Sequence, residues 1–468
     1  MKPFKLSGPL QWACALTLST TLTACEGAGG SSPSGGMNLL LVTIDTTRAD
    51  GLSCYGAERG RTPVIDRLAN RALLFERAYS ATNVTKPSHL SIMTGSRAIE
   101  HRVFNNQVLI PESVEALPLF MSAKGYRTGA FVAAVQLGEE TGWQGFEVVK
   151  GPPKGKSQRI GQEVVDDALS WMRADDDRPF FAWAHFFDPH TLYSPPKKFA
   201  KRFYKGDPTA GDGPLLSDAP WFDGWEYKPM QQWIEGVRDP EYPRAMYAAE
   251  LAYTDQQIGR LLKYLEQGEL FEETVVVLTS DHGEHFGEHG LYYDHAGLYE
   301  TALHIPLIVR VPGTPTAESG ARSTELVSQL DIVPTLVELF GLRVEHPTSG
   351  QSLRPLLMNQ PEAFESRDSL IFESAHNHQI AIRSERWKLI VPINMEHRFL
   401  GTEPELFDLT VDPGEENNLA AEHPEVVKQL AFQLTPWLDT GTLAKGELPE
   451  MSEEVRSGLE SLGYLGDD

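Results

Sequence analysis

Cysteine is scarce in this sequence, with three in 468 residues. Cys14 and Cys25 lie in or directly after an apolar segment near the N-terminus, which leaves Cys54 as the remaining thiol. Disulfide-stabilised proteins need paired cysteines, and we therefore expect no internal disulfide. Long apolar runs are also missing beyond residue 25, because none reaches the roughly 20 residues that a membrane-spanning helix requires.

Basic residues are few relative to acidic ones: 41 Lys and Arg stand against 65 Asp and Glu, for a formal net charge of -24. Nucleic acids are bound by basic surfaces, so this balance argues against a nucleic acid partner. The contents of 41% hydrophobic and 23% charged residues are typical of a globular protein and exclude disorder as the main state. An anionic substrate would need local positive charge, such as a metal ion.

The N-terminus resembles an export signal. Lys2 and Lys5 precede a modest apolar stretch from Leu10 to Leu22, and small residues lead into Cys25. We interpret residues 1–24 as a lipoprotein signal peptide, with Cys25 lipidated and residues 25–37 a flexible Gly/Ser-rich tether. This predicts a lipid-anchored protein of the bacterial cell envelope, on its periplasmic or cell-surface face. The alternative is an ordinary secretory signal with an incidental cysteine.

Short apolar strand-like runs alternate with helix-like segments, the pattern of an α/β fold with a large, mostly parallel sheet and helices on both faces. Residues 38–368 are predicted to form this catalytic domain. Expected strands are 39–44, 129–135, 180–187, 275–279 and 307–311, and expected helices are 62–79, 245–265 and 331–339. Residues 195–243, rich in Pro, Trp, Gly and Asp, are interpreted as an insertion near the site, with a role either in substrate binding or in packing.

The pattern changes near residue 370. Strand-like segments at 370–373 and 387–391 precede a turn at residues 412–414 and a helix over about 424–438. Residues 369–468 are therefore predicted to form a smaller C-terminal α+β subdomain. The sequence does not indicate an oligomeric state.

Polar residues follow several of the expected strands. Asp45 follows LLLVTI, Asp281 and His282 follow VVVLTS, and His185, Asp188 and His190 lie in or just after FFAWAHFF. Ligands of doubly wound sheets bind beyond the carboxyl ends of the strands, where these side chains would converge. Each one alone is more simply a turn or cap residue, but together they predict a metal site.

The segment Thr85-Lys86-Pro87-Ser88-His89 predicts a short helix with Pro87 near its start. Thr85 would lie just ahead of that helix, where unpaired N–H groups and the helix dipole favour an anion. The alternative is that Thr85 or Ser88 merely caps the helix.

The run from Asp281 to Gly290 (DHGEHFGEHG) contains the inverted zinc-protease pattern H-x-x-E-H from His285 to His289. That pattern needs both histidines on one helical face, and the glycines at 283, 287 and 290 disfavour a helix. We therefore favour Asp281 and His282 as adjacent metal ligands at a strand tip, with the following histidines in structural or supporting roles.

From Asn38 onward the chain resembles the sulfatase branch of the alkaline phosphatase superfamily. The resemblance covers about nine-tenths of the sequence and rests on NLLLVTIDTTRADGLSCYG, TPVIDRLANRALLFERAYS, TKPSHLSIMTG, HFFDPH, TSDHGEHFGEHG, LYETALHIPLIVR, QLDIVPTLVELFGL, RSERWKLI and LFDLTVDPGEENNLA. It implies an alkaline phosphatase-like fold and a metal-dependent hydrolase of sulfate or phosphate esters of small molecules or glycans.

The resemblance also implies roles for individual residues. Asp45, Asp281 and His282 would be metal ligands, and Thr85 would be the nucleophile and a further ligand. Four histidines fall at supporting positions: His89 where the family usually has an Arg that contacts nucleophile and anion, His101 beside the nucleophile, His190 near the leaving group, and His295 where many members have a Lys.

Three positions depart from the sulfatase pattern. Thr85 stands where sulfatases have a Cys or Ser, and Thr46 follows Asp45 in place of a second Asp. His282 stands where sulfatases often have an Asn or another oxygen ligand, a change that resembles the phosphonate monoester hydrolases. Sulfatases oxidise the Cys or Ser to an aldehyde, whereas a Thr would give a ketone. Thr85 could still attack directly as a metal-activated alkoxide.

The mixed nitrogen and oxygen ligand set predicts one divalent metal ion, with manganese or zinc favoured and calcium possible. We therefore predict hydrolysis of sulfuric or phosphoric esters through Thr85 at this single-metal site. Two alternatives are a phosphodiesterase or phosphonate hydrolase rather than a sulfatase, and a binding lipoprotein that keeps the metal pocket without turnover.

Overall fold

The computed structural model describes residues 36–223, 228–345, 348–374, 378–393 and 400–441. The predicted signal peptide, Cys25 and most of the tether lie outside these residues. Among the helices of the described ranges, none is long and apolar enough to cross a membrane.

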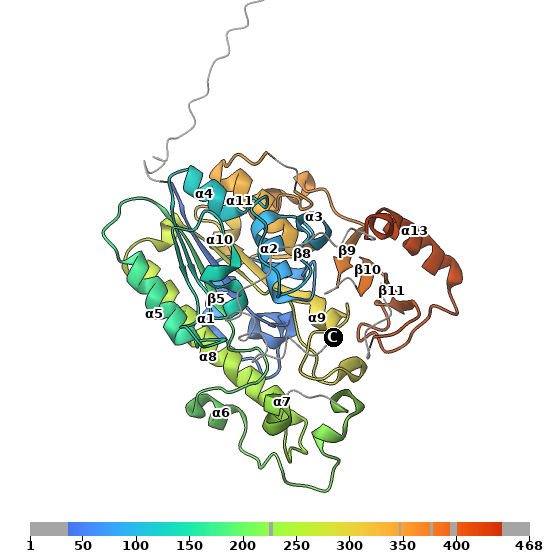
Figure 1. Ribbon diagram of the computed structural model, residues 1–468. Helices are drawn as coiled ribbons and strands as arrows, with labels where there is room; N and C mark the ends of the chain where they lie inside the picture. Colours follow the sequence, from blue (N-terminus) through green and yellow to red (C-terminus); the bar gives the residue numbers. More distant parts are fainter. Residues whose placement is uncertain (1–35, 224–227, 346–347, 375–377, 394–399, 442–468) are drawn as a thin grey trace, which may run out of the picture. The chain divides into compact units, whose positions relative to one another are not determined.

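In the described chain the larger sheet has eight strands in the order β4-β3-β5-β1-β6-β7-β2-β8 (Figure 1). Strand β1 lies at its centre and pairs in parallel with both β5 and β6. Only β7 runs antiparallel to its neighbours β6 and β2 within this sheet of the described residues. The predicted mostly parallel α/β sheet is therefore confirmed. The strands are β1 Asn38–Ile44, β2 Leu73–Tyr79, β3 Arg127–Phe131, β4 Val148–Lys150, β5 Phe180–Phe186, β6 Thr274–Thr279, β7 His304–Arg310 and β8 Arg322–Ser328.

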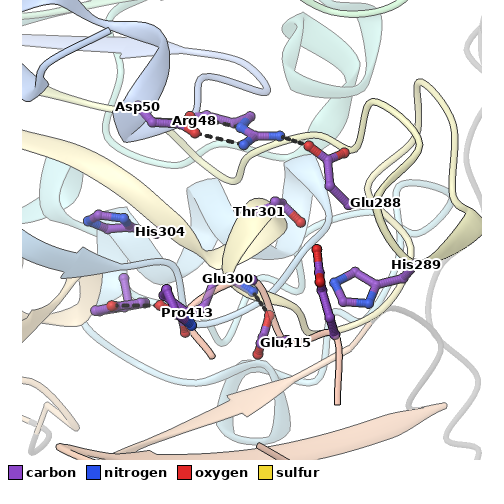
Figure 2. A pocket seen from close by; sticks show the side chains of 12 residues that line it. Arg48, Asp50, Glu288, His289, Glu300, Thr301, His304, Pro413 and Glu415 are labelled. Carbon is purple, nitrogen blue, oxygen red and sulfur yellow. Dashed lines mark hydrogen bonds and ion pairs between the residues drawn. The ribbon is translucent and has the colours of Figure 1, made fainter. Parts of the chain in front are cut away.

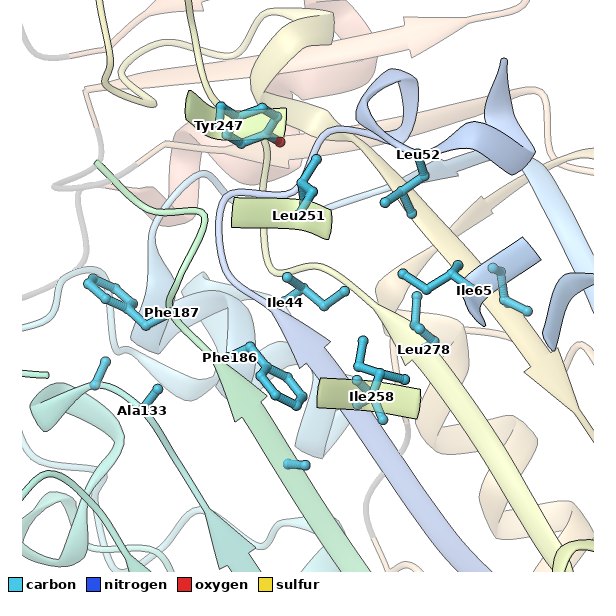
Figure 3. Close-up of a cluster of buried hydrophobic side chains, with 14 of the residues drawn as sticks. Ile44, Leu52, Ile65, Ala133, Phe186, Phe187, Tyr247, Leu251, Ile258 and Leu278 are labelled. Atoms are coloured by element: carbon cyan, nitrogen blue, oxygen red, sulfur yellow. The ribbon is translucent and has the colours of Figure 1, made fainter. Parts of the chain in front are cut away.

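Helices cover both faces of this sheet, and β1 shows why. Leu40 and Val42 pack with helices α1 (Pro63–Ala69), α5 (Gly161–Met172) and α8 (Glu241–Gln267). Figure 3 shows this core, in which Ile44 of β1 and Leu278 of β6 lie close to helix residues. Continuous apolar runs such as LLLV supply both faces of a strand that is buried on each side.

Leu39 and Leu41 of β1 pack on the opposite face, in a second core. That core includes residues of α2 (Thr85–Thr94), α4 (Leu117–Ala123) and α11 (Ile332–Phe340). Shorter helices complete the layers: α3 Ala98–His101, α6 Lys197–Phe203, α7 Lys228–Trp233, α9 Glu300–Leu303, α10 Pro315–Ser319 and α12 Arg354–Leu357.

The predicted helix over residues 62–79 is wrong in its second half. Helix α1 begins at Pro63 as expected but ends at Ala69, and Leu73–Tyr79 form strand β2. Strand β2 is held between β7 and β8, so tertiary pairing decides its conformation. The predicted start of the helix after Val84 is also shifted, because α2 begins at Thr85 itself rather than near Pro87.

The C-terminal part has the predicted α+β composition. A four-stranded antiparallel sheet in the order β12-β11-β10-β9 is formed by the described residues β9 Ser369–Glu373, β10 Gln379–Ser384, β11 Trp387–Pro392 and β12 Glu405–Asp408. Helix α13 (Pro424–Gly441) packs on it through Leu430 and Leu434, which contact Ile380 and Leu389. The proposed domain boundary at residue 368 stays a prediction.

Candidate active site

The predicted metal ligands lie at the carboxyl ends of the two central parallel strands β1 and β6. Asp45 directly follows β1, and Asp281 and His282 follow β6 by two residues. Ser280 joins the two strand ends, because its hydroxyl donates to the carbonyl of Ile44 at 2.7 Å and accepts from the N–H of Thr47 at 2.9 Å. The parallel pairing thus brings together residues more than 230 positions apart.

Each aspartate uses one carboxylate oxygen for the protein and keeps the other without a partner. Asp281 Oδ1 accepts hydrogen bonds from the N–H groups of Thr46 at 3.1 Å and His282 at 2.9 Å. Asp45 Oδ2 lies 3.2 Å from His185 Nε2. The other two oxygens, Asp45 Oδ1 and Asp281 Oδ2, are buried and lack a hydrogen-bond partner among the described residues.

His282 and Thr85 show the same pattern. His282 Nδ1 donates to the carbonyl of Gly283 at 3.0 Å, which leaves Nε2 as the basic nitrogen. That Nε2 lies 3.3 Å from Asp281 Oδ2, and neither it nor Thr85 Oγ1 has a hydrogen-bond partner in the described part of the chain. Ligand atoms of Asp45, Asp281 and His282 lie within 4.8 Å of one another.

Burial makes this arrangement costly without a cation. Asp45, Thr85, Asp281 and His282 are all 0% exposed. Burial raises the pKa of Asp45 well above its usual range, and the nearby charges of Asp281 and then Glu284 raise it further. Burial also raises the pKa of Asp281 and lowers that of His282 well below its usual range. A metal ion would satisfy the unpaired atoms and compensate both carboxylates, so the residues fit a divalent metal.

His185, which the sequence analysis grouped with the polar residues near the strand ends without a specific role, is a supporting residue. It lies in β5, and its Nδ1 accepts from the N–H of Ala133 at 3.2 Å. Its proton must therefore be on Nε2, which donates to Asp45 Oδ2. Such outer hydrogen bonds orient metal-binding carboxylates. The available signal was a histidine inside the otherwise apolar strand FFAWAHF.

Two further residues near the site have unsatisfied polar atoms. Thr46 has φ of 50°, a strained value for a β-branched residue, and its Oγ1 is buried without a partner. Gln136 is fully buried in a 3₁₀ turn (Val135–Leu137) that packs against α2, and neither its Oε1 nor its Nε2 has a partner among the described residues. Neither residue was assigned a role from the sequence.

The N-terminus of α2 offers Thr85 a dipole rather than a set of open N–H donors. The N–H of Lys86 donates to Asn106 Oδ1 at 2.8 Å, and that of Ser88 donates to the carbonyl of Val84 at 2.9 Å. Residue 87 is proline and has no N–H. The expected anion cradle at this helix end is therefore partly occupied by the protein itself.

His89 and His101 support α2 from within the protein. His89 Nδ1 donates to the Thr85 carbonyl at 2.7 Å, and its Nε2 lies 3.1 Å from Thr43 Oγ1. Burial lowers its pKa, so it does not supply the positive charge of an Arg. His101 Nε2 lies 3.2 Å from Ser91 Oγ, and burial lowers its pKa to about 3. Both histidines position the helix that carries Thr85.

His190 and His295 lie beside the ligands and are the partly accessible members of the group. Each is 8% exposed. The ring of His295 lies 4.2 Å from that of His282, and the rings of His190 and His295 are 6.0 Å apart. His190 stacks on Phe187, and burial followed by the charge of His295 lowers its pKa to about 3.

The remaining residues of the histidine-rich run point elsewhere. His285 uses both ring nitrogens, donating to the carbonyl of Ala296 at 2.7 Å and accepting from Thr301 Oγ1 at 2.7 Å. Glu288 and His289 instead line a separate cavity of about 740 Å³, shown in Figure 2. Residues 285–289 do not form an α-helix, which excludes the inverted zinc-protease arrangement.

Two tryptophans of the insertion, Trp221 and Trp233, pack against other side chains. Trp221 is 4% exposed and belongs to the main core, and Trp233 packs edge-on against Tyr193 at 5.3 Å. Trp225 lies outside the described residues.

The family model for sulfatases matches residues 37–342. The chain belongs to the sulfatase family. The family lies in the alkaline phosphatase superfamily, and this member is a hydrolase of sulfuric or phosphoric esters. A second model, for the C-terminal part of N-sulphoglucosamine sulphohydrolase, matches residues 287–439 of this sulfatase-family chain.

Two curated relatives match most of this sulfatase-family chain. The N-acetylglucosamine-6-O-sulfatase of Bacteroides thetaiotaomicron is 24% identical over 84% of this chain and 84% of its own length. The human N-sulphoglucosamine sulphohydrolase is 27% identical over 92% of this chain and 94% of its own. Among solved structures, the phosphonate monoester hydrolase of Agrobacterium radiobacter shares the fold, with a TM-score of 0.69, 24% identity, and coverage of 88% of this chain and 98% of that one.

Proposed function

We propose that this protein is an exported, metal-dependent hydrolase of sulfuric or phosphoric esters that attacks its substrate through Thr85. One observation carries the proposal: Asp45 Oδ1, Thr85 Oγ1, Asp281 Oδ2 and His282 Nε2 are all buried without a partner at one edge of the central strands. Membership of an ester hydrolase family supports it and disfavours a binding protein without turnover.

These four residues would hold one divalent metal ion, which would supply positive charge for the ester's oxygens and lower the pKa of the Thr85 hydroxyl. The set of three oxygens and one imidazole nitrogen favours manganese or zinc and leaves calcium possible. In the described ranges the clustered His and acidic residues provide for one such site.

The proposed reaction has two displacements. Thr85 Oγ gives its proton to bulk water and bonds to the sulfur or phosphorus, while the bond to the leaving oxygen breaks and that oxygen takes a proton from the protonated form of His190 or His295, which solvent then reprotonates. Water then attacks the same sulfur or phosphorus, and Thr85 leaves with a proton. Because burial keeps His190 neutral in the free protein, it needs the negative charge of the bound ester to become an acid.

The nucleophile favours phosphoric over sulfuric esters as the second candidate function. The aldehyde route of sulfatases does not work for a threonine, whose oxidation gives a ketone. Either covalent intermediate on Thr85 must then turn over by attack of water on phosphorus or sulfur, which is the ordinary second displacement of a phosphorylated enzyme but differs from the aldehyde-dependent release of sulfatases. The two curated relatives, in contrast, are named for sulfated sugars, which supports a sulfatase.

Localisation is a separate part of the proposal. It rests on the N-terminal sequence, with cleavage before Cys25 and lipidation of its thiol. Expression in a bacterial host, followed by fractionation and mass spectrometry of the N-terminal peptide, tests it. A Cys25→Ser variant serves as the control that cannot be lipidated. An intact N-terminus on the mature protein, or wild-type protein found in the soluble fraction like this variant, would contradict lipid anchoring.

The experiment that tests the activity uses the protein from residue 26 onward with measured metal content. Aryl sulfate, phosphate monoester, phosphate diester and phosphonate monoester substrates are assayed beside Thr85→Ala and Thr85→Ser. We expect at least one substrate to be cleaved, with loss of turnover in Thr85→Ala and partial retention in Thr85→Ser. Full activity of Thr85→Ala would remove Thr85 as the nucleophile, and no cleavage by the metal-loaded protein would count against the hydrolase.

A further inference from the structure

A cavity of about 450 Å³ adjoins the proposed site and is lined by His190. It lies between the loop after β5, the segment before α5 and the middle of α8. Its lining includes Phe187, Asp188, Glu250 and Tyr253. The ring of His190 lies 6.0 Å from that of His295, which lies 4.2 Å from that of His282, so one candidate acid belongs both to the cavity lining and to the surroundings of the metal ligands.

Two acidic residues, the partly buried Asp188 and the buried Glu250, line this cavity. Glu250 is 4% exposed, and its Oε1 accepts a hydrogen bond from the N–H of Ser194 at 2.8 Å. Asp188 Oδ1 accepts from the N–H of Gly161 at 3.0 Å, whereas its Oδ2 is buried and lacks a partner among the described residues. Burial and then the charge of Asp188 raise the pKa of Glu250 to about 9, and a cation beside these groups would stabilise the ionised form of Glu250.

Of the two basic side chains in the lining, Arg159 is already hydrogen-bonded to other parts of the protein. Arg159 is 8% exposed, and its three nitrogens donate to the carbonyl of Val132, to Asp167 and to the carbonyl of Lys150, at 2.9, 2.6 and 2.7 Å. The other lining cation, Lys156, is exposed. Within the described lining, the interior is therefore acidic.

We propose that this cavity receives the leaving alcohol of the ester and selects an alcohol that carries an ammonium group, held between Asp188 and Glu250. The proposal rests on the ester hydrolase function and names the substrate class for the same site. The ring of Tyr253 also belongs to the lining, and aromatic rings can support a cation. Such an ester is a zwitterion, so it meets less repulsion from a protein of net charge -24 than a simple anion does.

The test uses two nearly isosteric esters, a 2-aminoethyl ester and a propyl ester. Both are esters of whichever acid, sulfuric, phosphoric or phosphonic, the activity assays above identify. We expect kcat/KM for the aminoethyl ester to exceed that for the propyl ester by at least about tenfold. Glu250→Gln and Asp188→Asn should remove most of this preference and bring kcat/KM for the two esters to within about twofold of each other. Glu266→Gln, at the exposed end of the same helix, is the matched control and should keep the preference.

Calorimetry with the Thr85→Ala variant separates this proposal from the hydrolase itself. Tighter binding of the aminoethyl ester than of the propyl ester, lost in Glu250→Gln, would support the cavity's role even if no ester were hydrolysed. Equal binding and equal cleavage of the two esters would overturn the ammonium proposal while the hydrolase stands. A preference for the glucose 6-ester over both, lost in the same variants, would also overturn it in favour of a neutral polyhydroxy alcohol.

Discussion

Replacing Glu250 by Gln should remove a pH-dependent cost from the stability of the protein. Burial and Asp188 raise the pKa of Glu250 to about 9 in the folded state, against an ordinary value of 4.5. Between these values the folded protein holds a proton that the unfolded chain has lost, so the free energy of unfolding falls as the pH rises. Glu250→Gln lacks this proton equilibrium and keeps the hydrogen bond to the Ser194 N–H.

The size of the effect follows from the pKa. Each pH unit between the two pKa values costs about 1.4 kcal/mol, so wild type should lose about 4 kcal/mol between pH 5 and pH 8 relative to Glu250→Gln. This is an upper value, because local relaxation reduces the cost of a buried charge. Equilibrium urea unfolding of wild type, Glu250→Gln and the exposed control Glu266→Gln, at pH 5, 6.5 and 8, measures the difference. Parallel pH dependence of wild type and Glu250→Gln would refute the reasoning.

Three further predictions concern the metal site and the C-terminal sheet. His185→Ala should weaken metal binding by about ten- to a hundredfold, because Asp45 loses the hydrogen-bond donor that orients it. Calorimetric titration with Mn²⁺ or Zn²⁺ measures the affinity, and an unchanged affinity would contradict the role of His185. Chelation of the metal should lower the unfolding temperature of wild type. The expected loss of stability is about 3 kcal/mol when the metal was present at a hundredfold excess over its Kd. Asp281→Asn should show little shift by scanning calorimetry, and equal shifts in the two proteins would argue against the site. Lys388→Met should lower the free energy of unfolding, measured in urea, by about 3 to 5 kcal/mol. The fully buried Lys388 forms ion pairs with Glu300 at 3.2 Å and Glu415 at 2.7 Å, and its loss leaves both carboxylates without this cation. An unchanged free energy of unfolding would show that these carboxyl groups hold protons instead.

Much of the fold was predictable because its strands are buried on both faces. LLLVTI and VVVLT read as strands from composition alone, and the structure has β1 and β6 there. The prediction of a helix over Leu73–Tyr79 is wrong, because the apolar residues of LLFERAY follow neither a helical nor a strand repeat clearly. The conformation of this segment depends on its pairing with β7 and β8. Thr62 and Pro63 predict where the helix begins. Local sequence does not show that the residues after the helix pair with strands distant in the chain.

The sequence determined which residue types are available for chemistry: an aspartate and an aspartate-histidine pair after buried strands, a threonine at a helix start, and several histidines. Their chemistry follows from side-chain identity and from position after a strand, which are local properties. The tertiary structure decided what each one does. Only folding leaves Asp45 Oδ1, Asp281 Oδ2 and His282 Nε2 unpartnered while other atoms of the same side chains are bound.

The same division explains the histidines and the cavity. His285 and His289 share a motif in the sequence, yet folding binds one inside the protein and places the other at a separate cavity. Asp188 and Glu250 are more than sixty positions apart and carry no joint signal, and only the packing of α8 beside the end of β5 makes them neighbours. Hydrogen bonding and burial are relations between distant residues, so three-dimensional structure alone determines them.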